Sequence, residues 1–529
     1  MGGGNVAFIS SRFLREGRQL PPELETARVE IEALAKGYGL DFFETIFEMC
    51  TYEEINMVAA YGGFPNRYPH WRFGMEYLQM QKSYEYGLSK IYEMVINTEP
   101  SYAYLMDCNL VVDQKLVMAH VFGHVDFFKN NLWFQHTDRK MLDQMANHAT
   151  KIRNIMDRHG QAEVEAFIDI CLSLDNLIDP YAPHIRRQRE VSEEQIEAAE
   201  MDGSVPKIPA KNYMDRHINP PEFLASQKKK KAEELSRLKS FPEAPERDVL
   251  GFLIQFASLK RWQRDVLQIV RSEAMYFAPQ GQTKIMNEGW ATYWHTRMMT
   301  THILSDAEVI DYADHHSGTV HMTPGKLNPY KLGVELWRHI EERWDKGRFG
   351  KDWIDCDDPR VRARWDTGAG EGREKIFQVR RTHNDITFLD TFLTPDFCEE
   401  QGFFTTRYEP RTGRWIIDSR EFMAVKQQLL NMLATRGSPR VLVTDANAYN
   451  RGELMLNHPH EGMDIQLQWA AQVMKNLSMI WGRPVHLNTI IDGKPVRLTH
   501  DGSEFTQKNP EKERTEPASD SEEKDVDES

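Results

Sequence analysis

Two histidines four residues apart, His120 and His124, have the spacing of a metal-binding pair. The apolar residues around them, from 110 to 128, predict a buried helix. Residues four apart on a helix lie on one face, with Cβ atoms about 5–6 Å from each other. Two imidazoles placed in this way can bind one ion, at about 2.0–2.1 Å each for zinc. The spacing therefore predicts half of a metal site.

The third ligand must come from another segment, and Glu288 is the natural candidate. It lies near the start of a second helical stretch, 287–295, where many aromatic residues would make an unpaired buried carboxylate costly. Two histidines and one glutamate leave a coordination position for water, as in catalytic zinc sites. The same ligands with open positions also suit Fe(II) chemistry. We therefore expect a divalent metal, with zinc first and iron second.

The general base is the part that the motif lacks. In zinc peptidases with a His-Glu-x-x-His helix, the glutamate after the first histidine is the base, and Val121 stands there in this chain. We expect the base to come from Glu273, Asp126 or His295. His295 follows Glu288 by about two turns, roughly 10.5 Å along a helix. This distance favours a role in orienting a ligand or in moving a proton, and a role as fourth ligand stays open.

One alternative competes with a metal-site interpretation of this histidine pair. His120 and His124 can also be core histidines that hydrogen-bond to backbone or carboxylate groups. The density of polar side chains among aromatic ones from 271 to 288 favours the metal site.

A further cluster consists of Asp314, His315, His316 and His321. It can line a pocket or form a second metal site, although its setting near glycine and proline is also typical of polar coil.

Several longer motifs occur in an order that points to a known family. They are His120 to Asn131, the stretch Tyr-Phe-Ala-Pro-Gln at 276–280, Asn-Glu-Gly-Trp-Ala at 287–291 and Asn-Pro-Tyr-Lys-Leu-Gly at 328–333. Together they resemble the SpoVR family, the stage V sporulation protein R proteins. The stretch at 287–291 also resembles the segment that supplies the glutamate ligand in gluzincin aminopeptidases. The SpoVR resemblance implies a bacterial protein with a role in forming the spore cortex, a peptidoglycan layer. It also implies a serine protein kinase of the PrkA type as a partner.

Composition limits the classes of function. The chain has 529 residues, of which 40% are hydrophobic and 11% aromatic, enough for two or three globular domains. No run of about 18 apolar residues is present, and the first residues lack the features of a signal peptide. We therefore expect a cytoplasmic protein without a membrane span. Together with the cell-wall role that the SpoVR resemblance implies, this favours a peptidoglycan precursor or a protein as substrate. The net charge of −15 argues against a nucleic-acid partner. Five cysteines without a C-x-x-C pair indicate reduced thiols.

The apolar pattern divides the chain into five segments. These are a helical domain over 1–185, a charged insertion over 186–247, a helical continuation over 248–410, an α+β domain over 411–502 and a disordered acidic tail over 503–529. Within the first, residues 41–47 are predicted as helix. The fold class is thus mainly α, with helices that can carry a gluzincin-like metal site. The two halves of that site flank the insertion and must meet in space.

The C-terminal domain alternates between strand and helix patterns. Strands are predicted at 415–417, 440–444, 453–456 and 485–490, and helices at 420–434 and 463–481. The order strand-helix-strand-strand-helix-strand is typical of a ferredoxin-like α+β unit. Such a fold does not identify a function.

These observations support two hypotheses. In the first, His120, His124 and Glu288 hold a metal that serves hydrolysis or transfer of an amide bond, and Glu273 or His295 moves the proton. In the second, the protein is a non-catalytic regulatory or assembly protein of a stress or developmental programme. There a metal or a buried polar cluster only holds the helices together. Val121 favours the second hypothesis, and the polar and aromatic surroundings of Glu288 favour the first.

Overall fold

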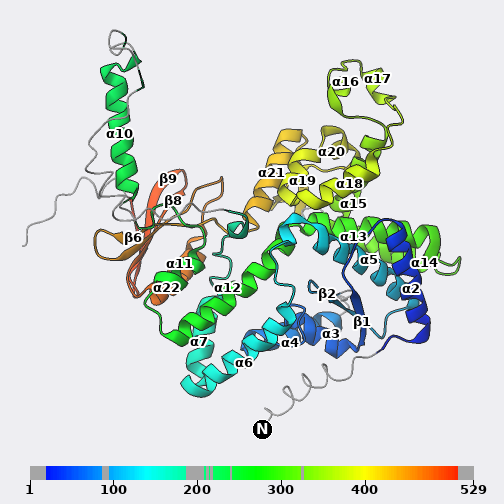
Figure 1. The fold of residues 1–529 in the computed structure, drawn as a ribbon, viewed down its shortest axis with the longest axis horizontal. Coiled ribbons are helices and arrows are strands. Elements are labelled where there is room, and N and C mark those ends of the chain that lie inside the picture. Colours follow the sequence, from blue (N-terminus) through cyan, green and yellow to red (C-terminus); the bar gives the residue numbers. More distant parts are fainter. Residues whose placement is uncertain are drawn as a thin grey trace, which may run out of the picture. The chain divides into compact units, whose positions relative to one another are not determined.

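The structure is a computed structural model that describes residues 19–85, 94–185, 208–209, 214, 218–238, 241–322 and 327–509. It is mainly helical, as predicted (Figure 1). The chain forms two compact units, each made of two segments. Unit 1 contains residues 1–165 and 275–436, and unit 2 contains residues 166–274 and 437–529. Two of the three boundaries fall inside helices, α7 (Gln161–Leu172) and α12 (Arg261–Gln282), and the third follows residue 436.

Unit 1 is built around helices that lie far apart in the sequence. Its larger helices are α2 (Pro22–Gly37), α3 (Tyr52–Ala60), α4 (Trp71–Glu85), α5 (Val111–Asn130), α6 (Met141–His159), α13 (Lys284–Met298), α14 (Val309–Thr319), α15 (Pro329–Asp345), α18 (Gly372–Thr382), α19 (Asp385–Phe392) and α21 (Phe422–Thr435). Shorter helical turns are η1 (Leu132–Phe134), η3 (Met299–Ile303), α16 (Gly350–Ile354), α17 (Pro359–Ala363) and α20 (Pro395–Gln401).

Two small sheets complete unit 1. β1 (Thr45–Cys50), β3 (Ser101–Met106) and β2 (Met94–Ile96) form the first, and β4 (Thr405–Glu409) and β5 (Arg414–Ser419) form the second. β1 runs parallel to β3 along its whole length. The helix predicted over 41–47 is therefore wrong, because its second half lies in β1. The β-branched residues Thr45 and Ile46 and the aromatic Phe47 favour a strand.

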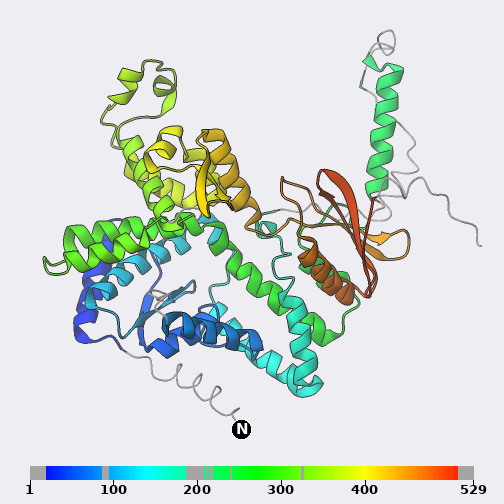
Figure 2. The ribbon, with the colours of Figure 1, turned by 180° about the vertical axis from the view of Figure 1, so that it is seen from behind.

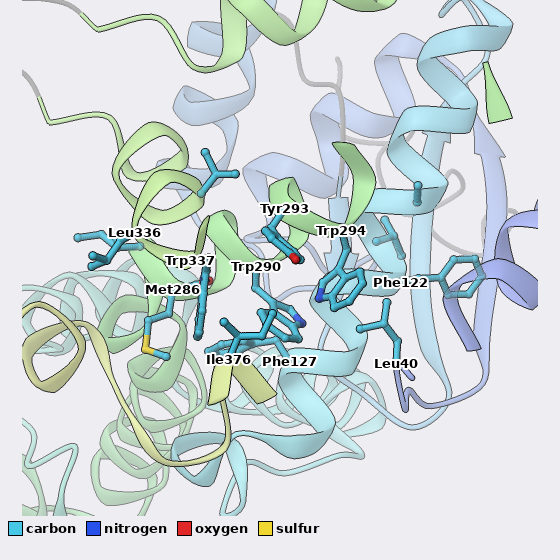
Figure 3. Packing of buried hydrophobic residues seen from close by; sticks show 14 of the residues in the cluster. Leu40, Phe122, Phe127, Met286, Trp290, Tyr293, Trp294, Leu336, Trp337 and Ile376 are labelled. Carbon is cyan, nitrogen blue, oxygen red and sulfur yellow. The ribbon is translucent and has the colours of Figure 1, made fainter. Parts of the chain in front are cut away.

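The core of unit 1 lies where α5, α13, α15 and α18 pack together (Figure 3). Trp290 of α13 contacts Trp337 of α15, with ring centroids 5.0 Å apart. Glycines allow the helices to approach closely. A Cβ built on Gly289 of α13 would collide with the backbone of Gly333 in α15. α13, which carries Glu288, is thus held tightly inside the core. Figure 3 also labels Met286, Tyr293 and Trp294 of α13 itself, and the core side chains Leu40, Phe122, Phe127, Leu336 and Ile376 from other segments.

Unit 2 combines helices with one five-stranded sheet. Beside its parts of α7 and α12 it contains η2 (Ala182–His184), α10 (Pro221–Leu238), α11 (Val249–Phe256), α22 (Leu467–Trp481) and the strands β6 (Leu442–Ala448), β7 (Glu453–Asn457), β8 (Val485–Ile491), β9 (Lys494–His500) and β10 (Phe505–Lys508). The strand order is β10-β9-β8-β7-β6, and only β7 and β8 are parallel. α22 connects these two and lies against one face of the sheet (Figure 2).

The ferredoxin-like arrangement is not confirmed. Its first predicted strand, 415–417, lies in β5 and pairs with β4, so it does not join the sheet of β6 to β10. Two further strands, β9 and β10, follow β8 instead. β10 falls inside the tail that was expected to be disordered, and residues 510–529 lie outside the described residues. The predicted pairing failed because a strand can join any sheet edge that offers backbone hydrogen-bond partners. The local residue pattern does not specify which edge that is.

The segment predicted as a charged insertion contains α10, and the lysine run at 228–231 lies on this helix. Lys228, Lys229 and Lys230 are exposed, as expected for a solvated segment. Most of residues 186–217 lie outside the described part of the chain. Among the described residues, no helix has both the length and the apolar character needed to cross a membrane.

Candidate metal centre

The two predicted halves of the site meet between α5 and α13. α5 is buried over most of its length, because it has apolar residues on every side. The side chains of His120 and His124 on this helix are only 2% and 4% exposed. α13 begins at Lys284 and presents Glu288 in its second turn. Gly123, between the two histidines, contacts Ala291 of α13. The close packing of the helices thus brings the carboxylate to the histidine pair.

The three predicted ligands form one group. His124 Nε2 lies 3.4 Å from Glu288 Oε2, and His120 Nε2 lies 3.7 Å from the same oxygen. One ligand atom from each residue lies within 4.8 Å of the other two. Ligands at about 2.0–2.1 Å from a tetrahedral zinc are about 3.3–3.4 Å apart. The three residues could therefore hold one metal ion after small adjustments of their side chains.

The other ring nitrogen of each histidine has its own partner on α13. His120 Nδ1 lies 2.7 Å from His295 Nδ1, and His124 Nδ1 lies 2.9 Å from Asn287 Oδ1. Both partners are buried. His295 therefore contacts a different edge of the His120 ring from the edge that faces Glu288. The orienting role considered for His295 stays a prediction, and Asn287 is a contact that sequence reasoning missed.

Asp126, one of the candidate bases, is engaged in a separate buried network. Its carboxylate accepts hydrogen bonds from Arg380 Nη1 at 2.8 Å, from Trp290 Nε1 at 2.8 Å and from the backbone of Asp41 at 2.8 Å. Burial raises the pKa of Asp126 to about 6, and the Arg380 guanidinium opposes this shift. The network joins α5, α13 and α18, so Asp126 holds the helices together and is occupied by these contacts.

Another carboxylate determines where α13 begins. Asp385, at the start of α19, accepts hydrogen bonds from the backbone N–H groups of Ile285 and Met286, each at 2.9 Å. These N–H groups belong to the first turn, where a helix has no partners of its own. Burial raises the pKa of Asp385 to about 7, while the two N–H donors lower it. Asp385 thus caps the helix that carries Asn287, Glu288 and His295.

The histidines of the further candidate cluster lie on or next to α14. His315 and His316 are on this helix, and His321 is exposed just after it. The His316 ring is perpendicular to that of His295, with centroids 5.6 Å apart, and stacks on Tyr312. Burial lowers the pKa of His316. The spacing of four residues between Tyr312 and His316 was the sequence signal for this helix face.

Tyr330 and Glu273 were the remaining residues of interest. Asn328 caps α15 by accepting hydrogen bonds from the backbone N–H groups of Tyr330 and Lys331. This cap places the Tyr330 ring 6.2 Å from the His120 ring, measured between centroids. Glu273 lies in the part of α12 that belongs to unit 2 and is 3% exposed. Its role as a proton carrier stays a prediction.

Comparison with known proteins agrees with the motifs. Residues 19–438 match the family described as SpoVR like protein, and this range contains α5, α13 and α15. A curated relative, named "Uncharacterized protein YcgB" from Escherichia coli (strain K12), is 28% identical over 497 residues, which cover 88% of this chain and 91% of the relative. No solved structure matches the chain. The family match spans most of the sequence, and the chain therefore belongs to the SpoVR family.

Proposed function

We propose that this protein is a metal-dependent enzyme that hydrolyses or transfers an amide bond. The observation that carries the proposal is the convergence of His120 Nε2 and His124 Nε2 on one oxygen of Glu288, at 3.7 and 3.4 Å. A structural zinc site commonly has four protein ligands, whereas three ligands leave room for water or substrate. A zinc ion bound there would polarise a carbonyl group and lower the pKa of a bound water.

The protein side chains would divide the remaining tasks. His120, His124 and Glu288 would hold the ion, with iron as the second choice of metal. Glu273 stays the candidate base from the sequence alone. Asp126 is the less suitable base, because its carboxylate accepts hydrogen bonds from Arg380 and Trp290. His295 contacts the Nδ1 edge of His120, which favours a role in orienting that ligand over direct proton transfer to substrate.

The proposed substrate is a peptidoglycan-related precursor or a protein. The role in formation of the spore cortex is what the family resemblance implies, and an amide-bearing precursor is a substrate that a cytoplasmic enzyme can reach. A serine protein kinase of the PrkA type is the proposed partner. These assignments rest on the family resemblance and on the expected cytoplasmic location.

Val121 supports a second candidate function, that of a regulatory or assembly protein with a structural metal. Val121 is fully buried and belongs to the hydrophobic core of unit 1. The position that carries the base in His-Glu-x-x-His peptidases therefore has an apolar, structural role here. In this case the ion would stabilise the contact between α5 and α13 and take part in no reaction.

Elemental analysis by mass spectrometry tests the metal centre on which both candidates draw. The wild-type chain is purified after growth with added zinc or iron, beside His120→Ala, Glu288→Ala and the control His136→Ala, whose residue is exposed. We expect close to one metal per chain in the wild type and the control, and loss in the two ligand variants. A folded wild type without metal would remove the enzyme proposal and leave a metal-free scaffold.

A further inference from the structure

The two histidine ligands are held from behind by different chemical groups. His124 Nδ1 meets an amide oxygen of Asn287 at 2.9 Å, and His120 Nδ1 meets an imidazole nitrogen of His295 at 2.7 Å. Both contacts come from α13, the helix that also supplies Glu288. α13 therefore touches each histidine twice, once through the carboxylate and once through a hydrogen-bonding group.

The contact with Asn287 determines where the hydrogen of His124 resides. A neutral imidazole has one N–H and one nitrogen with a free lone pair. The amide oxygen of Asn287 can only accept a hydrogen bond, so His124 Nδ1 must donate it. His124 Nε2 then has the lone pair, and this is the atom 3.4 Å from Glu288 Oε2. Asn287 thus selects the tautomer that can bind a metal.

The contact with His295 leaves two arrangements for His120. If His120 Nδ1 donates, its Nε2 has a lone pair directed toward the ligand group. If His295 Nδ1 donates instead, the hydrogen of His120 is on Nε2, which cannot then bind a metal. Only the first arrangement is compatible with an ion. Metal binding and the direction of this hydrogen bond are therefore coupled, which is not so for His124.

We infer that Asn287 and His295 are positioning residues that set the tautomers of His124 and His120 for metal binding. This inference rests on the metal centre of the proposed function. It assigns roles to two buried contacts that could otherwise serve only to satisfy polar groups in the core. Hydrogen-bond partners of this kind commonly change metal affinity by about 10–100-fold when removed. A purely structural role would instead lower the stability of the fold without a specific effect on affinity.

The test measures Zn²⁺ affinity by competition with a chelating dye on the full chain. Asn287→Leu and His295→Phe remove the acceptors, and we expect each to weaken Zn²⁺ binding about 10–100-fold. Asn287→Asp and His295→Gln keep an acceptor oxygen and should bind Zn²⁺ at least as tightly as the wild type. His295→Gln is the most informative, because an amide oxygen aligned with His120 Nδ1 would impose the competent tautomer. Absorption spectra of the Co²⁺-loaded chain report the geometry of the ligands independently.

A matched control separates positioning from general loss of stability. Asn131 is a buried asparagine of unit 1 that donates to the backbone oxygens of Arg380 and His383. Asn131→Leu should lower the melting temperature without changing the Co²⁺ spectrum or the Zn²⁺ affinity of the folded chain. Equal losses of affinity in Asn131→Leu and Asn287→Leu would overturn the inference. So would unchanged affinity in both Asn287→Leu and His295→Phe.

The outcomes also distinguish this inference from the proposed function. Failure of the wild-type chain to bind Zn²⁺ would remove the metal centre and the positioning roles together. Tight binding that depends on Glu288 but on neither Asn287 nor His295 would remove only the positioning roles. Weakened binding in the two apolar variants, in a protein that shows no hydrolase or transferase activity, would support the positioning roles and a structural metal.

Discussion

Gly123 of α5 lies so close to Ala291 of α13 that a Cβ built on Gly123 would be 2.7 Å from the Cα of Ala291. Gly123 directly precedes His124, and Ala291 lies less than one helical turn after Glu288. The distance between the helices, and with it the distance between the histidines and the carboxylate, depends on the absence of a side chain at position 123.

Gly123→Ala should therefore force α5 and α13 apart. Overpacking of this kind destabilises proteins by about 1–3 kcal/mol, and we expect weaker Zn²⁺ binding as well. Thermal unfolding and dye competition measure the two effects. Gly74→Ala in α4 is the control, because a Cβ built there has no neighbour within 4 Å. It should leave Zn²⁺ affinity unchanged. A Gly123→Ala chain with wild-type stability and affinity would contradict the packing argument.

Val121→Glu restores the sequence His-Glu-x-x-His but should not create a base. Val121 is fully buried in the core, so the new carboxylate would be desolvated and unpaired. We expect a loss of unfolding free energy on the order of 3–5 kcal/mol, measured by urea denaturation.

Val121→Gln has a side chain of the same length without the charge. The difference in unfolding free energy between Val121→Glu and Val121→Gln should increase from pH 5 to pH 8. Burial disfavours the charged form of the glutamate in the folded chain, so the glutamate ionises at a lower pH in the unfolded chain. A stable Val121→Glu chain would mean that position 121 faces open space.

The buried pair of Arg380 and Asp126 should be among the costliest contacts of the core to break. The two side chains are 2% and 0% exposed, and the ion pair measures 2.8 Å. Arg380→Met leaves a buried carboxylate without its cation, for which we expect a loss of about 3–5 kcal/mol in unfolding free energy. The exposed pair of Arg407 and Asp418 is the control. Arg407→Met should change stability by less than about 1 kcal/mol, and equal effects would contradict the role assigned to Asp126.

Asp385 should make the stability of the metal-free chain depend on pH. Burial raises the pKa of Asp385 to about 7, above the ordinary value of 3.8, so the folded state retains a proton that the unfolded state has released. The contribution of this group to stability therefore decreases as the pH rises from about 4 to above 7.

The Asp385→Asn variant has no carboxyl group that can titrate at this position. The unfolding free energy of the wild type relative to Asp385→Asn, measured in urea with a chelator present, should therefore fall over this range. A difference that is constant from pH 4.5 to pH 8 would show that Asp385 is ionised throughout.

Local patterning predicted the elements whose signals are short-range. The histidine pair on a buried helix and the helix around Glu288 both depend on residues within one or two turns, and the structure confirms these helices. The helix predicted over 41–47 failed because β1 gains its hydrogen bonds from β3, which lies more than fifty residues later. A strand at 415–417 was predicted and lies in β5, but its pairing with β4 was not predicted.

The sequence by itself determined which residues can bind a metal, because ligand chemistry and helical spacing are local properties. It also pointed to the family, through several long motifs that follow one another along the chain. Only the tertiary structure decided that Glu288 reaches the histidines, that His295 and Asn287 contact their Nδ1 atoms and that Asp126 pairs with Arg380. These relationships join residues more than 150 positions apart. They depend on how closely glycine-containing helices can pack, a property that no local window of sequence contains.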